Sequence, residues 1–377
     1  MFMDISSEMI HSLLPVFLTG VLGVSALSVG IIEGIAEATA STVKIFSGAV
    51  SDWIGRRKPL LLLGYGLATL TKPLFPLAHS FETVLLARFV DRIGKGIRVA
   101  PRDAYLADIT PQEQLGSAYG LRQTMDTTGA FIGPLLAVAL MIYTVNDYRF
   151  VFWAAIIPAL AVVFIIIFGV HEPAKKKQAE KRPFPLRPAD IKALSGTFWL
   201  VTAIASVLTL ARFSEAFLIL RGDNIGLSAA YAPAILIVMN IVYSASAWPV
   251  GALSDRIGRN GLLAVGIAML IAADLVLAFA TSPLLVFAGA ALWGLHMGLT
   301  QGIITAYIAQ NIPASLRGTG FGVYNFVTGL VLLAASVIAG WLWSAQGPAF
   351  TFGAGALFSA LSLAGFAALM PRLGKKE

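Results

Sequence analysis

Long apolar stretches recur along this chain of 377 residues, from one end to the other. A helix of about 18 or more mostly apolar residues is long enough to cross the roughly 30 Å hydrocarbon layer of a bilayer. Twelve such stretches occur, and we predict that each forms a membrane-spanning helix. Their approximate ranges are 9–29, 31–51, 59–79, 83–104, 116–142, 149–170, 196–218, 228–250, 260–280, 284–306, 319–343 and 348–370.

The composition agrees with this prediction, because 57% of the residues are hydrophobic and only 12% are charged. Soluble domains carry about 25% charged residues. Without cysteine, the chain can form neither disulfides nor a thiolate metal site. The net charge of +7 comes mainly from short basic clusters between apolar stretches, which is typical of a cytoplasmic membrane face and not of a nucleic-acid-binding protein. The partners we predict are therefore the lipid bilayer and no nucleic acid.

One connection differs from the others, because residues 171–194 are polar and contain four prolines and seven lysines or arginines. This connection predicts three parts: an N-terminal six-helix bundle over 1–170, a cytoplasmic basic linker over 171–194 and a C-terminal six-helix bundle over 195–377. Basic residues also follow the second, eighth and tenth stretches and the last one. The positive-inside rule then places both termini in the cytoplasm.

The two predicted bundles share a repeated sequence. The run Gly48-Ala-Val-Ser-Asp52-Trp-Ile-Gly55-Arg56 returns 203 residues later as Gly251-Ala-Leu-Ser-Asp255-Arg-Ile-Gly258-Arg259. Self-similarity at a fixed offset indicates a duplicated structural unit. A duplicated six-helix unit therefore accounts for the whole chain.

This repeated run resembles the cytoplasmic motif of the major facilitator superfamily (MFS), Gly-x-x-x-Asp-x-x-Gly-Arg-Arg/Lys, and the chain resembles the bacterial drug/proton antiporter-like branches of that family. The resemblance implies an all-α membrane protein with twelve transmembrane helices in two pseudo-symmetric six-helix bundles, which acts as a monomer by alternating access. It also implies a bacterial inner membrane as the location. It also implies that the motif residues form a gate. These residues are Gly48, Asp52, Gly55 and Arg56, with Asp255 and Arg259 in the second copy. A tight glycine turn with positive-inside charges is the simpler interpretation.

The fifth predicted helix carries Gly120-x8-Gly129-x3-Gly133-Pro134, which resembles the antiporter motif of exporters in that family. The resemblance adds Gly129, Gly133 and Pro134 to the gate and favours export. Small residues and a proline also allow two helices to approach closely. Generic tight packing is therefore the alternative interpretation of this run.

The fourth predicted helix is unusual, because Arg88, Asp91, Arg92, Lys95 and Arg98 all lie within it. A charge at the bilayer centre costs about 2.5–3.5 kcal/mol on insertion scales. At helical spacing these side chains share one face, so we predict that Arg88 to Lys95 line a polar cavity inside the protein. Arg102, Asp103 and in part Arg98 are expected to be solvated in the cytoplasm.

Three carboxylates within the predicted spans are candidates for proton coupling: Glu37, Asp126 and, next, Glu33. A buried carboxylate that gains and loses a proton between two conformations couples proton movement to transport. The alternative is that each is locked in a structural ion pair, Glu37 with Lys44 or Asp126 with Arg122.

Arginine and lysine exceed carboxylates within the first six spans, which favours an anionic substrate, because guanidinium groups match carboxylate and phosphate. The second half offers Arg212 and Glu215 with amide, hydroxyl and aromatic groups. The predicted substrate-binding residues are Arg88, Asp91, Arg92, Lys95, Arg122, Arg212, Glu215, Asn240, Tyr243, Trp293, His296, Gln301, Tyr324 and Asn325. For each of the polar groups in the second half of the chain, a helix–helix hydrogen bond is the alternative interpretation.

The chain lacks a Walker loop, a dinucleotide-binding turn, a His-Glu-x-x-His motif and a Gly-x-Ser-x-Gly elbow. We therefore predict no enzyme activity, no cofactor and no metal site. The function that we expect is proton-coupled export of a small organic anion or an amphiphilic drug-like compound. The alternatives are a proton-coupled importer of an anionic nutrient or metal–siderophore chelate and, more distantly, a non-transporting membrane sensor or lipid-modifying protein.

Overall fold

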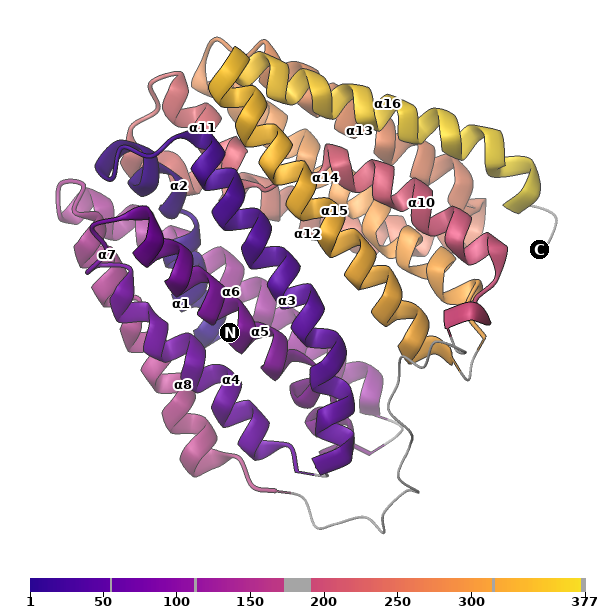
Figure 1. Cartoon of the computed structure of the whole chain (residues 1–377), viewed down its shortest axis with the longest axis horizontal. Coiled ribbons are helices and arrows are strands. Elements are labelled where there is room, and N and C mark those ends of the chain that lie inside the picture. The colour runs from indigo at the N-terminus through magenta and orange to yellow at the C-terminus, as the bar shows by residue number, and fades with distance from the viewer. Residues whose placement is uncertain (55, 112–113, 173–190, 314–315, 374–377) are drawn as a thin grey trace. The chain divides into compact units, whose positions relative to one another are not determined.

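The computed structural model of the chain describes residues 1–54, 56–111, 114–172, 191–313 and 316–373. Within these ranges the backbone consists of helices and short connections, and it contains no strand (Figure 1). The side chains of a few positions inside the helices, among them Asp52 and Asp255, lie outside the description.

The chain forms two compact units. The first comprises Met1–Gly23 and Ile35–Arg187, and the second comprises Val24–Gly34 and Pro188–Glu377. One long helix, α3, therefore contributes its first turns to the second unit and the rest of its length to the first.

The helices up to residue 169 are often interrupted. They are α1 (Phe2–His11), α2 (Leu14–Val16), the π-helix η1 (Phe17–Val21), α3 (Ala26–Ile54), α4 (Lys58–Thr71), the 3-10 helix η2 (Lys72–Leu74), α5 (Phe81–Ile109), α6 (Leu115–Tyr143), α7 (Tyr148–Ala154) and α8 (Ile156–Gly169). In the first unit, α4 packs against α5 and α8, and α1 packs against α6 and α8 (Figure 1).

The helices from residue 196 onward are longer on average. They are α10 (Gly196–Ala211), α11 (Ala216–Asn224), the 3-10 helix η4 (Ala229–Tyr231), α12 (Ala232–Ile257), α13 (Arg259–Ala278), α14 (Pro283–Gln310), α15 (Arg317–Gln346) and α16 (Pro348–Leu373). Helix α13 packs against both α14 and α16, and α14 also packs against α12.

Nine stretches in the described ranges are long and apolar enough to cross a membrane. The predicted spans 9–29, 59–79 and 83–104 are helical but are not among the nine. The first is interrupted after His11, the second ends as an α-helix at Thr71, and the third is α5 with its charged side chains. Charge or a break in the helix therefore sets these three spans apart from the nine.

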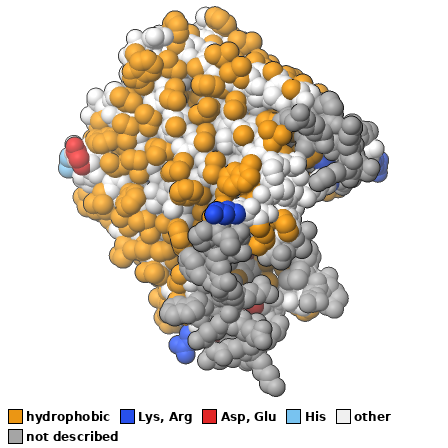
Figure 2. Space-filling model, turned by 45° about the vertical axis from the view of Figure 1, so that its right-hand side comes forward, with side chains coloured by type: hydrophobic (Ala, Val, Ile, Leu, Met, Phe, Trp, Pro, Cys, Tyr) orange, Lys and Arg blue, Asp and Glu red, His pale blue; other side chains and the backbone are white. Residues whose placement is uncertain are grey.

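The outward surface of the described ranges is strongly apolar. Large hydrophobic side chains such as Leu70, Tyr143, Trp248 and Leu284 are exposed. In the face drawn in Figure 2, hydrophobic side chains cover most of the described surface. A contiguous apolar surface of this extent marks a protein that faces lipid instead of water.

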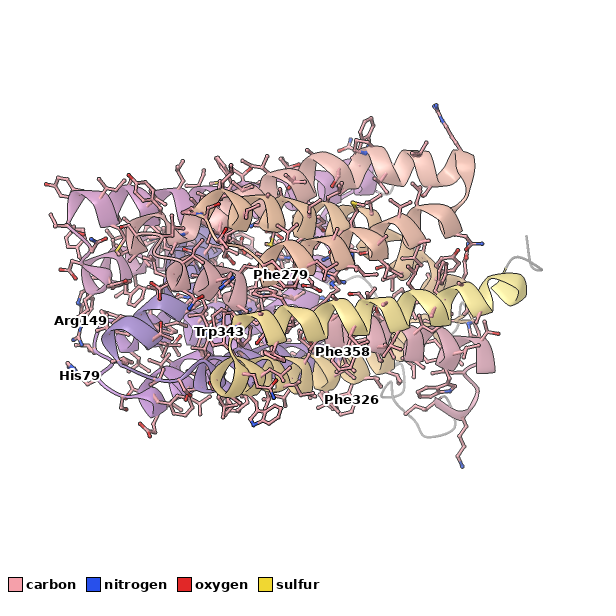
Figure 3. The ribbon with its side chains drawn as sticks, turned by 90° about the horizontal axis from the view of Figure 1, so that it is seen from above. His79, Arg149, Phe279, Phe326, Trp343 and Phe358 are labelled. Atoms are coloured by element: carbon pink, nitrogen blue, oxygen red, sulfur yellow. The ribbon has the colours of Figure 1, made fainter. Side chains whose placement is uncertain are left out.

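Polar residues in the connections hold the helix ends. Ser80 caps α5 by accepting a hydrogen bond from the Thr83 amide at 3.4 Å. Arg149, in the first turns of α7, donates to the carbonyl of Ala78 and lies against His79, both at 3.2 Å (Figure 3). These contacts join the connection before α5 to α7 and so set where the charged helix begins.

Candidate substrate and proton-coupling site

The charged face of α5 is turned toward protein. Helix α5 continues without a break through Gly94, Gly96 and Pro101, and Arg88, Asp91, Arg92 and Arg98 are at most 6% exposed. Burial against protein is the arrangement that a charge inside a membrane requires.

The expectation that Arg98 is partly solvated is wrong. Its guanidinium carbon lies 4.8 Å from the centre of the Tyr65 ring on α4, and the side chain is buried. A cation over an aromatic face is attracted by the ring quadrupole. Arg98 therefore helps to join α5 to α4.

Asp91 has a buried counter-ion that sequence reasoning missed. Lys72, in the 3-10 helix that follows α4, places its Nζ 3.0 Å from Asp91 Oδ1 and 3.1 Å from the Ser7 hydroxyl. The signal was a lysine alone in the apolar stretch 59–79. Asp91 stays a predicted substrate residue, but its contacts are those of a structural ion pair.

Glu37 on α3 pairs with Arg92 on α5, at 3.0 Å between Oε1 and Nη1. The proposed alternative partner, Lys44, is wrong, because that side chain is exposed and is not the partner of Glu37. Glu37 is about one-third exposed and Arg92 is buried, so the carboxylate remains open on one side.

Lys95 lies one turn beyond Arg92 on α5. It interacts electrostatically with Arg92, Glu37 and Glu8, but it forms no ion pair or hydrogen bond within the described ranges. Glu8 on α1 is itself 3.4 Å from His11 Nδ1. Lys95 is thus a half-buried cation without a counter-ion in direct contact.

Asp126 on α6 lies within a network of ion pairs, which includes the N-terminal ammonium group of Met1 at 3.8 Å. Arg122 Nη1 and Arg102 Nη2 approach Asp126 Oδ2 at 3.0 and 3.2 Å, and Asp103 contacts both arginines, at 3.3 Å from Arg102 and 3.6 Å from Arg122. The pairing of Asp126 with Arg122, the alternative to a proton-coupling role, is therefore present. The expectation that Arg102 and Asp103 are simply solvated is wrong, because both side chains belong to this network.

Gly129 and Gly133 on α6 form the surface on which α1 packs. A Cβ atom on Gly129 would lie 2.6 Å from the carbonyl oxygen of Met1, and one on Gly133 would lie 2.8 Å from that of Ile5. Only hydrogen fits at such distances. These glycines, which precede Pro134 within α6, therefore allow the close helix approach that was the alternative to a gate.

The repeated motif is described in part. Gly48 lies within α3, Arg56 is exposed and Arg259 is half-buried at the start of α13, whereas Gly55 and the side chains of Asp52 and Asp255 lie outside the description. In the second copy, Gly258 has φ +85°, a conformation that favours glycine, where α12 turns into α13.

A carboxylate does occupy a helix N-terminus beside the first copy of the motif. The amides of Arg57 and Lys58 donate to Glu172 at 2.6 and 3.0 Å, where α4 begins. Free amides and the helix dipole favour an anion at this end. Arg57 also joins α3 to α5 by contacting Ser51 at 2.6 Å and Asp108 at 3.2 Å.

In the second unit, the predicted span 196–218 is not one continuous helix. Helix α10 ends at Ala211 and α11 begins at Ala216, so residues 212–215 are not helical. The freed amide of Ser214 donates to the Ser336 hydroxyl of α15 at 3.3 Å. The sequence signal was Arg212-Phe-Ser-Glu215, two charges and a serine inside an apolar stretch.

Arg212 lies at this break and interacts electrostatically with Tyr324, Tyr243 and Glu215. Its half-buried guanidinium has no ion pair or hydrogen bond with any side chain that the structure describes. Tyr243 donates a hydrogen bond to Gln301 Oε1 at 3.0 Å. The remaining predicted polar residues of this unit, Asn240 and Asn325, are half-buried.

Trp293 and His296 have packing roles in this structure. Trp293 is buried with its ring centre 5.5 Å from that of Phe213, and His296 Nδ1 lies 2.7 Å from the carbonyl oxygen of Gly266 on α13. The His296 contact fits the helix–helix hydrogen bond that was its alternative, whereas Trp293 packs on a residue of the non-helical segment 212–215. Glu33, also buried, lies in the segment of α3 that belongs to the second unit.

A small apolar pocket lies within the second unit. It is lined by residues of α10, α13, α14 and α16, including Val201, Ile267 and Phe366, and contains none of the predicted site residues. Its wall does not suit an anionic group. In the described part of the chain, no three His, Cys, Asp or Glu side chains are grouped to bind a metal ion.

These features define a polytopic helical membrane protein with ionised groups buried inside its bundles. The family model of the Major Facilitator Superfamily matches residues 1–336 and 216–376. An uncharacterised MFS-type transporter of Methanocaldococcus jannaschii is 31% identical over 365 residues, which cover 95% of this chain and 90% of that protein. The chain therefore belongs to the Major Facilitator Superfamily, and the predicted family and fold class are confirmed.

Solved structures agree on the fold. A mutant of the nucleoside transporter NupG superposes with a TM-score of 0.83 over 98% of this chain and 97% of its own, at 12% identity. The human organic anion transporter MFSD10 gives 0.69 over 97% and 96%, at 16% identity. At these identities the likeness shows the fold alone.

Proposed function

We propose that this chain is a secondary active transporter that works by alternating access, uses protons as the coupling ion and carries a small organic anion or an amphiphilic compound with an anionic group. Membership of the Major Facilitator Superfamily supports the transport role. The substrate, the coupling ion and the direction are inferences from the site.

The proposal of an anionic substrate rests on the surroundings of two cations. Lys95 in the first unit and Arg212 in the second are half-buried, and neither has a counter-ion in contact among the described residues. A partly desolvated cation without a partner is costly, and an anion that binds beside it removes that cost. Each cation also has polar neighbours, Glu8 and Glu37 for Lys95 and two tyrosines for Arg212.

Glu37 is the first candidate for the proton-carrying group, with Asp126 and Glu33 after it. Its 3.0 Å contact with Arg92 would lose its charge attraction when the carboxylate takes up a proton. Arg92 would then be available to an anion. Asp126 pairs with Arg102 and Arg122, so its protonation would weaken both of these contacts and leave Asp103 as the carboxylate beside the two arginines.

Export is the direction that the exporter-like run at Gly129, Gly133 and Pro134 favours. Import is the second candidate, and the pair of Glu37 with Arg92 favours it. Because a proton on Glu37 frees Arg92 for the substrate, proton and anion would bind together. Binding together is the requirement of symport, whereas antiport requires that the two exclude each other.

We place the chain in the cytoplasmic membrane of its cell as a monomer with both termini in the cytoplasm, and we assign it no enzyme activity. The sensor alternative predicts ligand binding without movement of the ligand. The lipid-modifying alternative predicts a covalent product. Both are separated from transport by the experiment below.

The experiment begins with a thermal-shift screen of the purified chain against organic anions, phosphorylated compounds, siderophores and common drugs, at pH 6 and pH 8. A ligand raises the melting temperature when it binds the folded state preferentially. Counterflow of the labelled hit in proteoliposomes then tests transport, and the sign of the pH gradient that accelerates uptake gives the direction.

Lys95→Gln and Arg212→Gln are the variants that test the site. Each should weaken binding of an anionic hit, while Lys44→Gln, which replaces an exposed lysine of α3, should leave it unchanged. Equal binding by wild type and both site variants would overturn the anion site. Binding without counterflow in wild type would favour the sensor.

A further inference from the structure

The second unit contains a carboxyl group that the substrate site does not use. Asp274 on α13 is fully buried, and neither of its side-chain oxygens has a hydrogen-bond partner in the described ranges. It forms no ion pair there either. Sequence reasoning found only Arg212 and Glu215 as ionised groups in this half and missed Asp274.

The surroundings of Asp274 are apolar. On its own helix, Leu270, Ala273 and Leu277 are completely buried. From α16, Gly355 faces the carboxyl: a Cβ on Gly355 would lie 2.6 Å from Asp274 Oδ2 and 3.1 Å from Cε1 of Phe213. The carboxyl group thus lies beside the break at residues 212–215, where Phe213 is found.

The charged and titratable groups of the neighbouring elements are engaged elsewhere or lie at the break. Arg221 on α11 donates to the carbonyls of Leu277, Ala278 and Ala280 at the end of α13. His296, the histidine of α14, contacts Gly266, two turns before Asp274. Helix α16 carries no titratable residue from 348 to 371, and the break carries Arg212 and Glu215.

An ionised carboxylate in this position would be desolvated without compensation, at a cost of several kcal/mol. The neutral acid avoids that cost, so these surroundings favour the protonated carboxyl group. Because no part of Asp274 reaches the surface, the proton cannot leave until the packing around it changes. Such a change requires the least free energy at the adjacent break, because the helical hydrogen bonds are already interrupted there.

We propose that Asp274 is a proton-binding site of the second unit, which holds its proton in the conformation described here and exchanges it when the segment 212–215 moves. The role of this proton in transport rests on the proposed proton coupling. Arg212, which adjoins Phe213 in the break and has no counter-ion in contact among the described residues, supplies a partner for the ionised form. An anion bound to Arg212 would compete with that partnership and keep Asp274 protonated.

Infrared difference spectroscopy tests the occupancy without any substrate. The spectrum of the wild-type chain minus that of Asp274→Asn, in detergent at pH 7, should contain the C=O band of a protonated carboxylic acid. The matched control is Asp223→Asn on α11, whose side chain is exposed and should contribute carboxylate bands. Carboxylate bands for Asp274 at pH 7 would overturn the proposal.

The link to the break is tested by hydrogen–deuterium exchange of the same band. The chain has no cysteine, so Ser214→Cys with Ser336→Cys can be cross-linked across the contact that joins the break to α15. The cross-linked protein should exchange at least about tenfold more slowly than its reduced form, because opening is restrained. Equal rates would refute a role for this segment.

Neither readout depends on transport. A chain that moves none of the screened anions, yet holds an exchangeable proton at Asp274, would contradict the proposed function and leave the proton site standing. The reverse result, transport with an ionised Asp274, would remove this site and leave Glu37 and Asp126 as the candidates for coupling.

Discussion

Lys72 and Asp91 form an ion pair of 3.0 Å in which both side chains are buried, although they belong to different helices of the first unit. A buried charge that loses its partner destabilises a protein by about 3–5 kcal/mol, whereas replacing both partners by apolar residues is often nearly neutral. The pair therefore allows a test of whether Asp91 on α5 needs its counter-ion for the chain to be stable.

Lys72→Met should destabilise the chain by about 3–5 kcal/mol, because Asp91 would remain buried without its counter-ion. The double variant Lys72→Met with Asp91→Leu should recover most of that loss. Denaturant unfolding in detergent micelles measures both. Lys44→Met, at an exposed position, is the control. If the double variant loses as much unfolding free energy as Lys72→Met and Asp91→Leu lose together, then the ion pair is not the reason why these two side chains are buried.

Glu37→Gln should remove most of the pH dependence of anion binding, because its ion pair with Arg92 would be absent at every pH. In this variant the affinity of the anionic hit at pH 8 should rise above that of the wild type and approach the value at pH 6. The ratio of the two dissociation constants is the measurement. Glu82→Gln, at the exposed start of α5, should keep the wild-type ratio. An unchanged ratio in Glu37→Gln would assign the proton to another carboxylate.

Arg221→Gln should destabilise the second unit by about 2–3 kcal/mol, because hydrogen bonds from a charged group contribute about 1.5–3 kcal/mol to stability. The guanidinium donates to the carbonyls of Leu277 and Ala280 at 2.9 and 2.6 Å and to Asn224 Oδ1 at 2.6 Å. A lower melting temperature with unchanged ligand affinity is expected. A variant that melts like the wild type but binds the anion less well would show that Arg221 belongs to the site instead.

Gly133→Ala should destabilise the packing of α1 on α6 by about 1–3 kcal/mol, the usual range for overpacking a tight contact. Gly353→Ala in α16 is the matched control, because nothing lies within 4 Å of a Cβ there. That variant should gain about 0.5–1 kcal/mol, since alanine stabilises a helix interior relative to glycine. Equal tolerance of both substitutions would favour the gate interpretation of Gly133 over the packing one.

Several parts of the site were predictable because their signals are local. The polar stripe from Arg88 to Arg98 follows from helical spacing, and its burial follows from the cost of placing charges in lipid. The family motif at Gly48 to Arg56 was likewise visible in the sequence. The spacing of charges along one helix does not identify the partner of each charge, because those partners belong to other helices.

The sequence by itself determined the helices, their approximate ends and the presence of ionised groups inside them, because hydropathy and helical period are properties of consecutive residues. Only the tertiary structure decided that Glu37 meets Arg92 and that Asp91 meets Lys72. It also decided that residues 212–215 leave the helix and that Asp274 is enclosed without a hydrogen-bond partner among the residues that the structure describes. These features arise where helices distant in sequence approach each other, and the cost of leaving a charge unpaired there depends on what the neighbouring helix presents.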